Sequence, residues 1–444
     1  MKTSLSEIVR LEPSETIDTK LHSFKSGDVL VLFGELFQKG YANGLVDAAK
    51  KKGLKIIYST VGRRDEQQTL RPLTDEEGKN FTPHFINIPL ECGFDLEPSS
   101  PGGPTPVELC KSIGLKEGIQ GRIDLDLIKK SEQLGEQRFR RQVRNWIQEL
   151  EKHITPGSKV LIAHLMAGGV PRSKIILSLM NRAFKGVGDR YLSSEDFWNS
   201  DLGHFCQKSF SEVTANSFNI LLDETTTLRN KQTDSGGFIR YSAYGYHGTP
   251  IFFNQELQWL CYTPYLQGFA KKQLEDFSRY YWQKGIKACV YNCPEILTNS
   301  SGIFPGVEIF LYLLYFELKH RDVNHPLVQQ TLTKVESLVK PGGFEQIYQL
   351  ISSFLQSTEV QKTLDITSWP QHSTKSLMEL MLKTSDDIIA LHLNPQELMT
   401  TPLSELIIYA SGHLMLEESF NPQHPVAWIG HDAIIKFFEV SKSF

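Results

Sequence analysis

The sequence predicts an α/β protein whose core is a doubly wound, mainly parallel sheet. The first observation is a short apolar run at residues 27–34, which lacks the alternation of a half-exposed strand and is typical of a strand buried on both faces. The second is a helical pattern at residues 45–53 that ends at a glycine and is followed by another buried run at residues 54–61. Together these segments predict a β-α-β unit near the start of the chain.

The same alternation continues through most of the chain. Further strand-like runs are separated by helical patterns, which predicts parallel strands with right-handed crossovers, as in a Rossmann-type fold. The predicted strands cover residues 85–90, 159–169, 237–248 and 286–293, and the predicted helices cover residues 126–153, 205–229 and 264–284. Residues 91–125 are rich in proline and glycine and predict an inserted loop region. We therefore predict a dinucleotide-binding and catalytic domain over residues 1–325, with a helical extension over residues 326–444 packed on it.

The composition is that of an ordinary globular protein. Of 444 residues, 40% are hydrophobic and 22% charged, and the net charge of −4 implies no general attraction to nucleic acid or anionic lipid. No segment has the length and apolar character of a membrane span, and the polar N-terminal segment does not resemble a secretory signal. Six scattered cysteines without a CxxC pair predict no metal site and indicate reduced thiols in a cytoplasmic protein. The sequence does not decide whether the protein forms an oligomer.

A glycine-containing turn connects the first predicted strand to the first helix. Gly34, Gly40 and Gly44 stand where a sharp turn, a close approach to a pyrophosphate and tight helix packing each favour glycine. The helix start near Tyr41 would offer free N–H groups and a positive dipole to the phosphates. We interpret the segment as a dinucleotide-binding turn. Its spacing is not the standard G-x-G-x-x-G, and an ordinary β-α turn is the alternative.

Two arginines follow the second predicted strand. An acidic residue here would bind the adenosine ribose of NADH, whereas an arginine would accept the 2′-phosphate of NADPH. Arg63 and Arg64 therefore favour NADPH over NADH. Because Asp65 follows directly, a solvated charged turn is the alternative interpretation.

Tyrosines and lysines gather around the start of the helix at residues 264–284. A reductase needs an acid that stabilises a developing oxyanion, and a tyrosine beside a lysine ammonium provides one. Tyr265 and Lys272 are seven residues apart and would share one face of a helix. Tyr262 and Lys271 are nine residues apart, but Pro264 suits a first helical position, so Tyr262 would precede the helix and would be able to turn back. Plain packing of the tyrosines and solvation of the lysines is the alternative.

These segments together resemble the short-chain dehydrogenase/reductase superfamily and, within it, the enoyl-ACP and enoyl-CoA reductases. The glycine turn is similar to the widely spaced phosphate turn of the enoyl reductases. The resemblance covers roughly residues 27–325 and also rests on three other segments, namely Tyr262-x8-Lys271, the turn His164–Gly169 and the segment Pro294–Gly302.

The resemblance implies site residues as well as a fold. Tyr262 would be the catalytic acid, and Lys271 would hold the nicotinamide ribose and support the tyrosine. Tyr244 would be the second tyrosine of the family, with an insertion between it and Tyr262. The residues implied for cofactor binding are Gly34, Gly40, Tyr41, Gly44, Arg63, Arg64, Ala167, Gly168, Lys271 and Thr298.

The resemblance implies an NADPH- or NADH-dependent reduction of the C=C bond of a 2-enoyl thioester in fatty-acid metabolism. A carbonyl reductase of the same superfamily and a catalytically silent dinucleotide-binding protein are the alternatives. The acyl group would be carried by coenzyme A or by an acyl carrier protein, and the basic helical segment Arg138–Arg144 is a candidate docking surface for an acidic carrier. Asn216 is a candidate active-site amide, and His164 is most simply a core residue.

Overall fold

The computed structural model describes residues 9–11, 23–79, 81, 84–113, 118–246, 248–254, 256–260, 266–298, 306–363, 370–394 and 400–441. Its centre is a seven-stranded sheet with the order β11-β10-β7-β6-β1-β2-β5, in which every neighbouring pair is parallel. The predicted fold class is therefore confirmed. The strands are β1 (Val29–Phe33), β2 (Lys55–Thr60), β5 (Phe85–Pro89), β6 (Lys159–His164), β7 (Phe238–Gly245), β10 (Ala288–Asn292) and β11 (Val426–Trp428).

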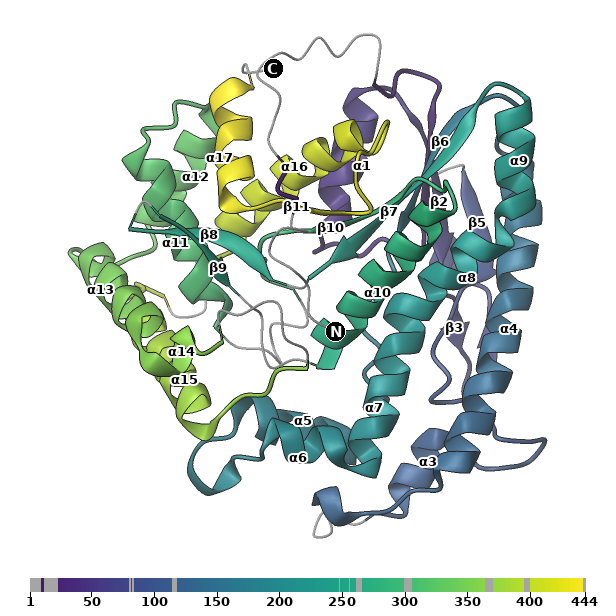
Figure 1. Ribbon diagram of the computed structural model, residues 1–444, viewed down its shortest axis with the longest axis horizontal. Coiled ribbons are helices and arrows are strands. Elements are labelled where there is room, and N and C mark those ends of the chain that lie inside the picture. The colour runs from purple at the N-terminus through teal and green to yellow at the C-terminus, as the bar shows by residue number, and fades with distance from the viewer. Residues whose placement is uncertain are drawn as a thin grey trace.

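Helices cover both faces of this sheet (Figure 1). Side chains of β1 alternate between the two layers: Leu30 and Leu32 pack in one hydrophobic cluster, and Val31 and Phe33 pack in the other. The first layer holds α1 (Ala42–Lys51), α11 (Val307–His320), α16 (Thr400–Glu418) and α17 (His431–Val440). The second holds α4 (Leu125–Glu151), α8 (Ser217–Glu224) and α10 (Leu266–Gln283).

A third hydrophobic cluster lies below the sheet in Figure 1, where α5 and α6 pass under the N-terminal end of α10. It joins α5 (Lys174–Lys185), α6 (Ser194–Asn199) and α7 (Asp201–Ser211) to Ala270 of α10. The remaining elements are β3 (Arg63–Arg64), β4 (Leu70–Arg71), β8 (Thr249–Phe253), β9 (Glu256–Leu260), α2 (Asp75–Gly78), α3 (Pro106–Lys111), α9 (Thr226–Asp234), α12 (Pro326–Glu336), α13 (Gly343–Gln356), α14 (Thr358–Gln361) and α15 (Lys375–Ile389).

The β8–β9 hairpin lies between β7 and α10 in the chain. It falls between Tyr244 and the helix that carries Lys271, which is where the sequence predicted an insertion. None of the helices within the described ranges is long and apolar enough to cross a membrane.

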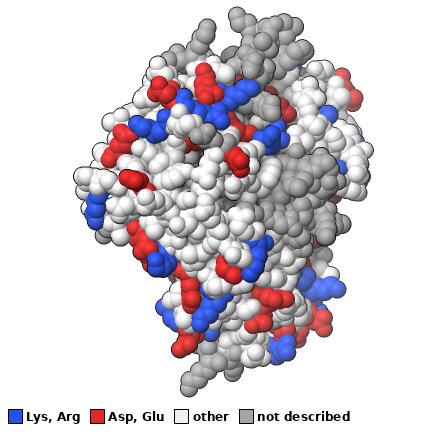
Figure 2. Space-filling model, turned by 60° about the vertical axis from the view of Figure 1, so that its left-hand side comes forward, with Lys and Arg blue, Asp and Glu red and all other residues white. Residues whose placement is uncertain are grey.

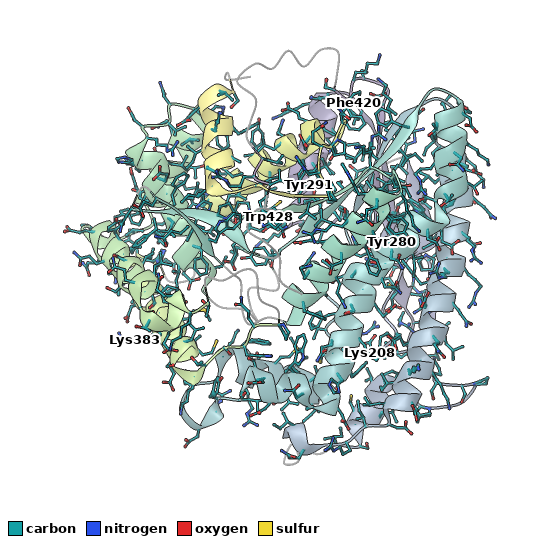
Figure 3. All side chains as sticks on the ribbon, in the orientation of Figure 1. Lys208, Tyr280, Tyr291, Lys383, Phe420 and Trp428 are labelled. Carbon is teal, nitrogen blue, oxygen red and sulfur yellow. The ribbon has the colours of Figure 1, made fainter. Side chains whose placement is uncertain are left out.

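The C-terminal region contributes to the central sheet as well as to the helical layers. β11 pairs with β10, and the short segment at residues 9–11 pairs in turn with Trp428. Tyr291 and Trp428 are fully buried at this end of the sheet (Figure 3). The sequence predicted only helices beyond residue 325, so β11 is an addition that the pattern did not indicate. The domain boundary at residue 325 stays a prediction.

Candidate functional site

The candidate site lies at the carboxyl ends of β1 and β6, where the strand order reverses direction. Chain connections run to β2 on one side of β1 and to β6 on the other, and this switch point is where doubly wound sheets bind ligands. Gly34 ends β1 with φ +112°, a left-handed conformation that favours glycine. A Cβ atom on Gly34 would lie 3.3 Å from Cβ of Leu165, so the two strand ends approach each other closely here.

The turn after Gly34 leads into the N-terminus of α1 and leaves open space. No described atom lies within 4 Å of the position that a Cβ atom on Gly40 would occupy. The Asn43 side chain donates hydrogen bonds of 2.9 Å to the carbonyl oxygens of Phe37 and Gly40 and so fixes the turn to the helix. Sequence reasoning missed Asn43, because an amide inside a helix start carries no signal of its own. The fixed turn and the positive end of the ten-residue helix suit a phosphate group.

Gly44 serves helix packing, which is one of the three reasons that favour glycine in this segment. A Cβ atom on Gly44 would lie 1.8 Å from the carbonyl oxygen of Ile408, and one on Gly412 would lie 2.0 Å from the carbonyl carbon of Gly44. These two glycines therefore let α1 and α16 approach backbone to backbone. Gly44 packs against the C-terminal region and does not line the open side of the turn.

Alanine substitutions should separate these two kinds of glycine. Gly44→Ala should destabilise the protein by about 3 kcal/mol or more, because the new methyl group overlaps the α16 backbone and cannot be relieved by side-chain rotation. Gly40→Ala should leave the unfolding temperature unchanged but weaken binding of the dinucleotide. Thermal unfolding and calorimetric titration with NADH measure the two effects, and a stable Gly44→Ala variant would contradict the assigned packing.

The two arginines proposed to bind a 2′-phosphate are both engaged by carboxylates. Arg63 donates bonds of 3.0 and 2.9 Å to the Glu35 carboxylate, and Nε of Arg64 lies 2.8 Å from Oε2 of Glu91. The expected pair of free guanidinium groups is therefore not what the structure places here. Sequence reasoning missed these partners because Glu35 follows β1 and Glu91 follows β5, and both are distant in the chain from Arg63 and Arg64.

Glu35 brings a carboxylate to the end of β2 although it follows β1. It accepts a 2.8 Å bond from the Thr60 hydroxyl and a 3.3 Å bond from the Val61 N–H. Burial raises the pKa of Glu35, but the bonds from Arg63 and Thr60 outweigh it and hold that pKa below its ordinary value. Dinucleotide-binding sheets place the ribose-binding acid at the end of the second strand, and Glu35 supplies a carboxylate there.

Lys271 reaches the carboxyl end of β7. It lies in the second turn of α10, is 6% exposed, and its Nζ donates a hydrogen bond to the backbone carbonyl of Tyr244. Burial lowers the pKa of Lys271 to about 8. Lys272 points elsewhere, because its Nζ lies 2.5 Å from Oδ1 of Asp276 on the same helix. Of the two lysines, only Lys271 approaches the strand ends.

Tyr244 presents a buried hydroxyl beside the glycine turn. Its ring stacks on Tyr41 with a centroid distance of 5.8 Å and an interplanar angle of 18°. The Tyr244 hydroxyl is buried and has no hydrogen-bond partner among the described residues. Burial raises the pKa of Tyr244 well above its ordinary value, so the hydroxyl keeps its proton. A buried donor without a partner needs an explanation, and a bound ligand oxygen would supply one.

The segment after β10 joins the same group of strand ends. The Tyr41 hydroxyl donates to the carbonyl oxygen of Pro294, and the Leu297 N–H donates a 2.9 Å bond to the Ser404 hydroxyl of α16. The predicted residue Thr298 follows directly. Tyr41 therefore ties together the glycine turn, Tyr244 and the segment after β10, which the sequence had assigned to one site.

The turn after β6 supplies a further open position. Gly168 has φ +102°, no described atom lies within 4 Å of the place where its Cβ would stand, and Ala167 precedes it. Its neighbour Gly169 is crowded, since a Cβ there would lie 2.5 Å from the Ser209 carbonyl oxygen. The Thr214 hydroxyl donates a 3.1 Å bond to the Gly168 carbonyl oxygen and holds the turn against a π-helical segment, Glu212–Asn216.

The remaining polar candidates form hydrogen bonds to other protein side chains. Asn216 donates a 2.9 Å bond to Glu212 and accepts a 3.0 Å bond from Asn219. His164 is 1% exposed with Nε2 2.7 Å from the Ser217 hydroxyl, and burial lowers its pKa to about 3. It is a neutral core residue. Tyr262 and Tyr265 both lie outside the described residues, as does the end of the Pro294–Gly302 segment beyond Thr298.

The described residues fit a dinucleotide. Space lies open at Gly40 and Gly168, the N-terminus of α1 faces the turn, and the Tyr244 hydroxyl is buried without a described partner. Among the described residues no group of His, Cys, Asp or Glu side chains is arranged to hold a metal ion.

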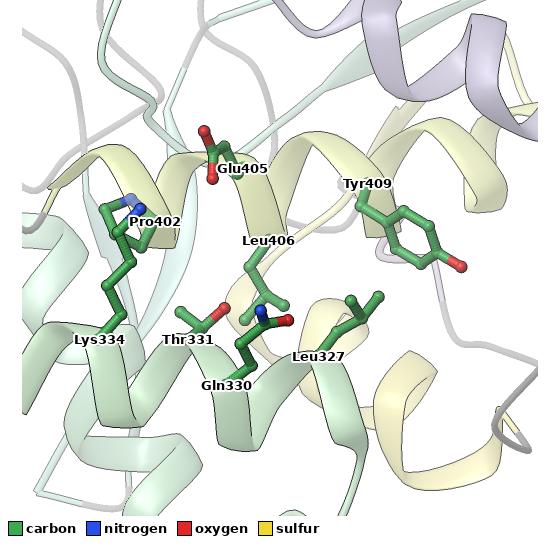
Figure 4. Close-up of a pocket in the computed structure, with 8 residues that line it drawn as sticks. All are labelled: Leu327, Gln330, Thr331, Lys334, Pro402, Glu405, Leu406 and Tyr409. Carbon is green, nitrogen blue, oxygen red and sulfur yellow. The ribbon is translucent and has the colours of Figure 1, made fainter.

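A separate pocket of about 300 Å³ lies between α12 and α16 (Figure 4). It is lined by Leu327, Gln330, Thr331, Lys334, Pro402, Glu405, Leu406 and Tyr409, none of which belongs to the predicted site. The face of the molecule on this side carries mixed charges around a broad uncharged area (Figure 2).

Comparisons with known proteins give a consistent result. The family model described as enoyl-acyl carrier protein reductase FabMG matches residues 11–438. A solved structure described as the apo structure of FabMG, a novel type of enoyl-acyl carrier protein reductase, has 41% sequence identity and a TM-score of 0.91, covering 99% of this chain and 98% of that chain. A second, described as the NADH-bound structure of FabMG, has 36% identity and a TM-score of 0.76, covering 98% of each chain. No curated protein matches the sequence.

Proposed function

Because this chain belongs to the family of FabMG enoyl-acyl carrier protein reductases, we propose that it reduces the C=C bond of a 2-enoyl thioester at the carboxyl ends of β1, β6 and β7. The observation that carries the location is the approach of Lys271 to Tyr244, beside a glycine turn that leaves room for a dinucleotide. The acyl group would be presented by an acyl carrier protein, the carrier that the family description names.

The proposed chemistry divides between the phosphate end and the reacting end of the site. Gly40, the α1 N-terminus and Gly168 would hold the pyrophosphate region of the cofactor. When bound, the nicotinamide supplies the hydride that the β-carbon of the enoyl thioester receives. Lys271 would hold the nicotinamide ribose and place a positive charge near the developing enolate oxygen, and a tyrosine hydroxyl would donate a hydrogen bond to that oxygen.

The proposed identity of that tyrosine rests on the spacing to Lys271. Tyr262 is the proposed acid, on the Tyr-x8-Lys271 spacing, and Tyr244 would help to position the substrate through its buried hydroxyl. The placement of Lys271, with Lys272 held by Asp276, supports the Tyr262–Lys271 pairing over Tyr265–Lys272.

The sheet also supports a place for this family within the short-chain dehydrogenase/reductase superfamily. Counted along the chain, the seven strands stand in the spatial order third, second, first, fourth, fifth, sixth and seventh, all parallel. The first six repeat the order of a doubly wound dinucleotide-binding sheet. The glycine turn and the lysine of α10 lie on the elements that the superfamily uses for them.

We expect NADH to bind at least about tenfold more tightly than NADPH. A 2′-phosphate would approach the Glu35 carboxylate, and like charges brought together cost several kcal/mol, while Arg63 and Arg64 are already neutralised by their partners. The NADH-bound relative agrees with this preference. Calorimetric titration with both dinucleotides measures it, and Glu35→Gln should narrow the difference by freeing Arg63. Tighter binding of NADPH by the unaltered protein would reinstate the arginines as a phosphate site.

The proposed reaction is tested by following NADH oxidation with two thioesters of one carrier. Crotonyl-ACP should be reduced to butyryl-ACP, whereas acetoacetyl-ACP should be turned over slowly or not at all. Preferred reduction of acetoacetyl-ACP would assign carbonyl reduction instead. Tight NADH binding without turnover of either thioester would indicate a silent dinucleotide-binding protein.

A further inference from the structure

Three of the four arginines in the basic segment that the sequence offered for carrier docking are paired with carboxylates in the structure. Nε of Arg138 lies 2.7 Å from Oε2 of Glu97. Arg140 and Arg144 share the Glu224 carboxylate at 3.0 and 2.8 Å. These arginines fasten α4 to neighbouring segments, so their charge is not available to an acidic partner.

A different group of cations lies on the exposed face of α5 and the turn after it. Lys174, Arg182, Lys185 and Arg190 form no ion pair with any described residue, and against these four cations the segment 174–190 carries a single acidic residue, the exposed Asp189. They surround two apolar side chains that are unusually exposed, Leu177 at 40% and Val187 at 47%. A cationic rim around exposed apolar side chains is typical of a protein-binding surface whose partner is acidic. We name this group the α5 surface.

Hydrogen bonds hold the turn of the α5 surface to α15 and to the segment before it. The Gly188 N–H donates a 3.1 Å bond to Glu379 of α15, and the Tyr191 hydroxyl donates a 2.9 Å bond to the Ser373 carbonyl oxygen. Nε of Arg182 donates a 3.2 Å bond to the Arg190 carbonyl oxygen, which fixes the turn that carries Arg190. A surface held in this way needs little ordering when a partner binds.

The opposite face of α5 is buried in the hydrophobic cluster that also includes the start of α10. Its buried side chains, including Ile175 and Leu179, share a hydrophobic cluster with Ala270, the residue before Lys271. The helix also follows the Gly168 turn directly in the chain. Figure 1 shows α5 below the N-terminal end of α10, so a flexible pantetheine arm anchored on α5 would extend toward that end of the site.

We infer that the acyl carrier protein docks on the α5 surface, with its acidic side chains toward Lys174, Lys185 and Arg190 and its apolar side chains toward Leu177 and Val187. This inference rests on the proposed function, because it names the partner that delivers the thioester. Carrier proteins of this class are small and acidic, which gives the charge complementarity that the cationic rim requires.

The test compares carrier-bound and free thioesters in charge-reversal variants. Lys174→Glu should raise KM for crotonyl-ACP by about tenfold, with kcat nearly unchanged, and the effect should shrink at high salt. It should not unfold the protein, because an acidic residue suits the first turn of a helix. The triple variant Lys174→Glu, Lys185→Glu, Arg190→Glu should raise KM for crotonyl-ACP further than Lys174→Glu alone. Arg141→Glu, an exposed cation on α4, is the matched control and should leave KM unchanged.

Crotonyl-CoA and the crotonyl thioester of N-acetylcysteamine separate the outcomes. Both should be reduced by the variants as by the unaltered enzyme. An equal loss with crotonyl-CoA would assign the cations to the phosphate of the pantetheine arm and would contradict docking. Unchanged KM for crotonyl-ACP in the triple variant would also contradict it. Failure of the unaltered enzyme to reduce any of the three thioesters would instead overturn the proposed function.

Discussion

Replacing Lys271 by methionine should lower kcat/KM for crotonyl-ACP by about 10²–10⁴-fold while the protein stays folded. The substitution removes the only charge that α10 brings to the carbonyl of Tyr244 among the described residues, and with it the proposed ribose contact. Lys272→Met is the matched control on the next residue, where the ammonium pairs with Asp276. Equal loss of activity in both variants, or no loss in either, would contradict the specific role proposed for Lys271 in the reaction.

The stability of the Lys271→Met variant should change far less than its activity. Burial lowers the pKa of Lys271 to about 8, from its ordinary value of 10.5. Between these values the unfolded chain carries a proton that the folded chain lacks, so the contribution of this group to stability rises with pH in that window. Below about pH 8 the buried charge costs stability. Methionine relieves this cost and loses the hydrogen bond to Tyr244, so we expect unfolding free energies within about 1 kcal/mol of each other.

The same titration predicts a pH profile. Lys271 carries its positive charge below its pKa and loses it above, so kcat/KM should fall as pH rises through about 8. Lys271→Arg keeps the charge at all accessible pH values. If Lys271→Arg retains measurable activity, that activity should not fall in this range. A fall of the same steepness in this variant would assign the titration to another group.

Tyr262→Phe should have an effect of similar size, about 10²–10⁴-fold on kcat, because it deletes the proposed acid and keeps the ring. Binding of NADH should survive, since Lys271 and the glycine turn remain. Tyr265→Phe is the matched control three residues further on. Tyr244→Phe should have a smaller effect that falls mainly on KM, because its hydroxyl is proposed to position the substrate.

The outcomes for these tyrosine variants distinguish between the possible catalytic tyrosines. Loss of turnover in Tyr265→Phe with normal turnover in Tyr262→Phe would replace the Tyr-x8-Lys pairing with a shorter one. Normal turnover in all three variants would mean that the catalytic acid is none of these tyrosines. Each variant is checked for folding by its thermal unfolding and for cofactor binding by titration.

The strands could be predicted from the sequence because they are buried on both faces. β1 is a continuous apolar run, and β2, which also contains Lys55, Ser59 and Thr60, is buried from Ile56 onward. This burial explains why both strands could be recognised in the sequence. β11 could not be found in this way. It has three residues between helical segments, and it is a strand only because β10 offers it an edge. Pairing of this kind is tertiary and leaves little trace in a local pattern.

The site was predictable where function depends on backbone and chain order, and less so where it depends on distant partners. The positive φ of Gly34 and the open space at Gly40 accord with the glycine pattern. Arg63 was expected to meet a phosphate, and the structure pairs it with Glu35, which follows β1. Gly44 was expected to serve the cofactor, and the structure packs it against a helix that begins more than three hundred residues later. Spacing along the chain encodes neither of these contacts.

The most direct test of the central claim is the fate of a labelled hydride. The enzyme is given crotonyl-ACP and NADH that carries deuterium at the transferable position of its nicotinamide ring, and the position of the label in the product is read by mass spectrometry and nuclear magnetic resonance. The proposed reaction predicts butyryl-ACP with one deuterium at the β-carbon. Butyryl-ACP without deuterium at that carbon, or no consumption of NADH in the presence of crotonyl-ACP, would contradict it.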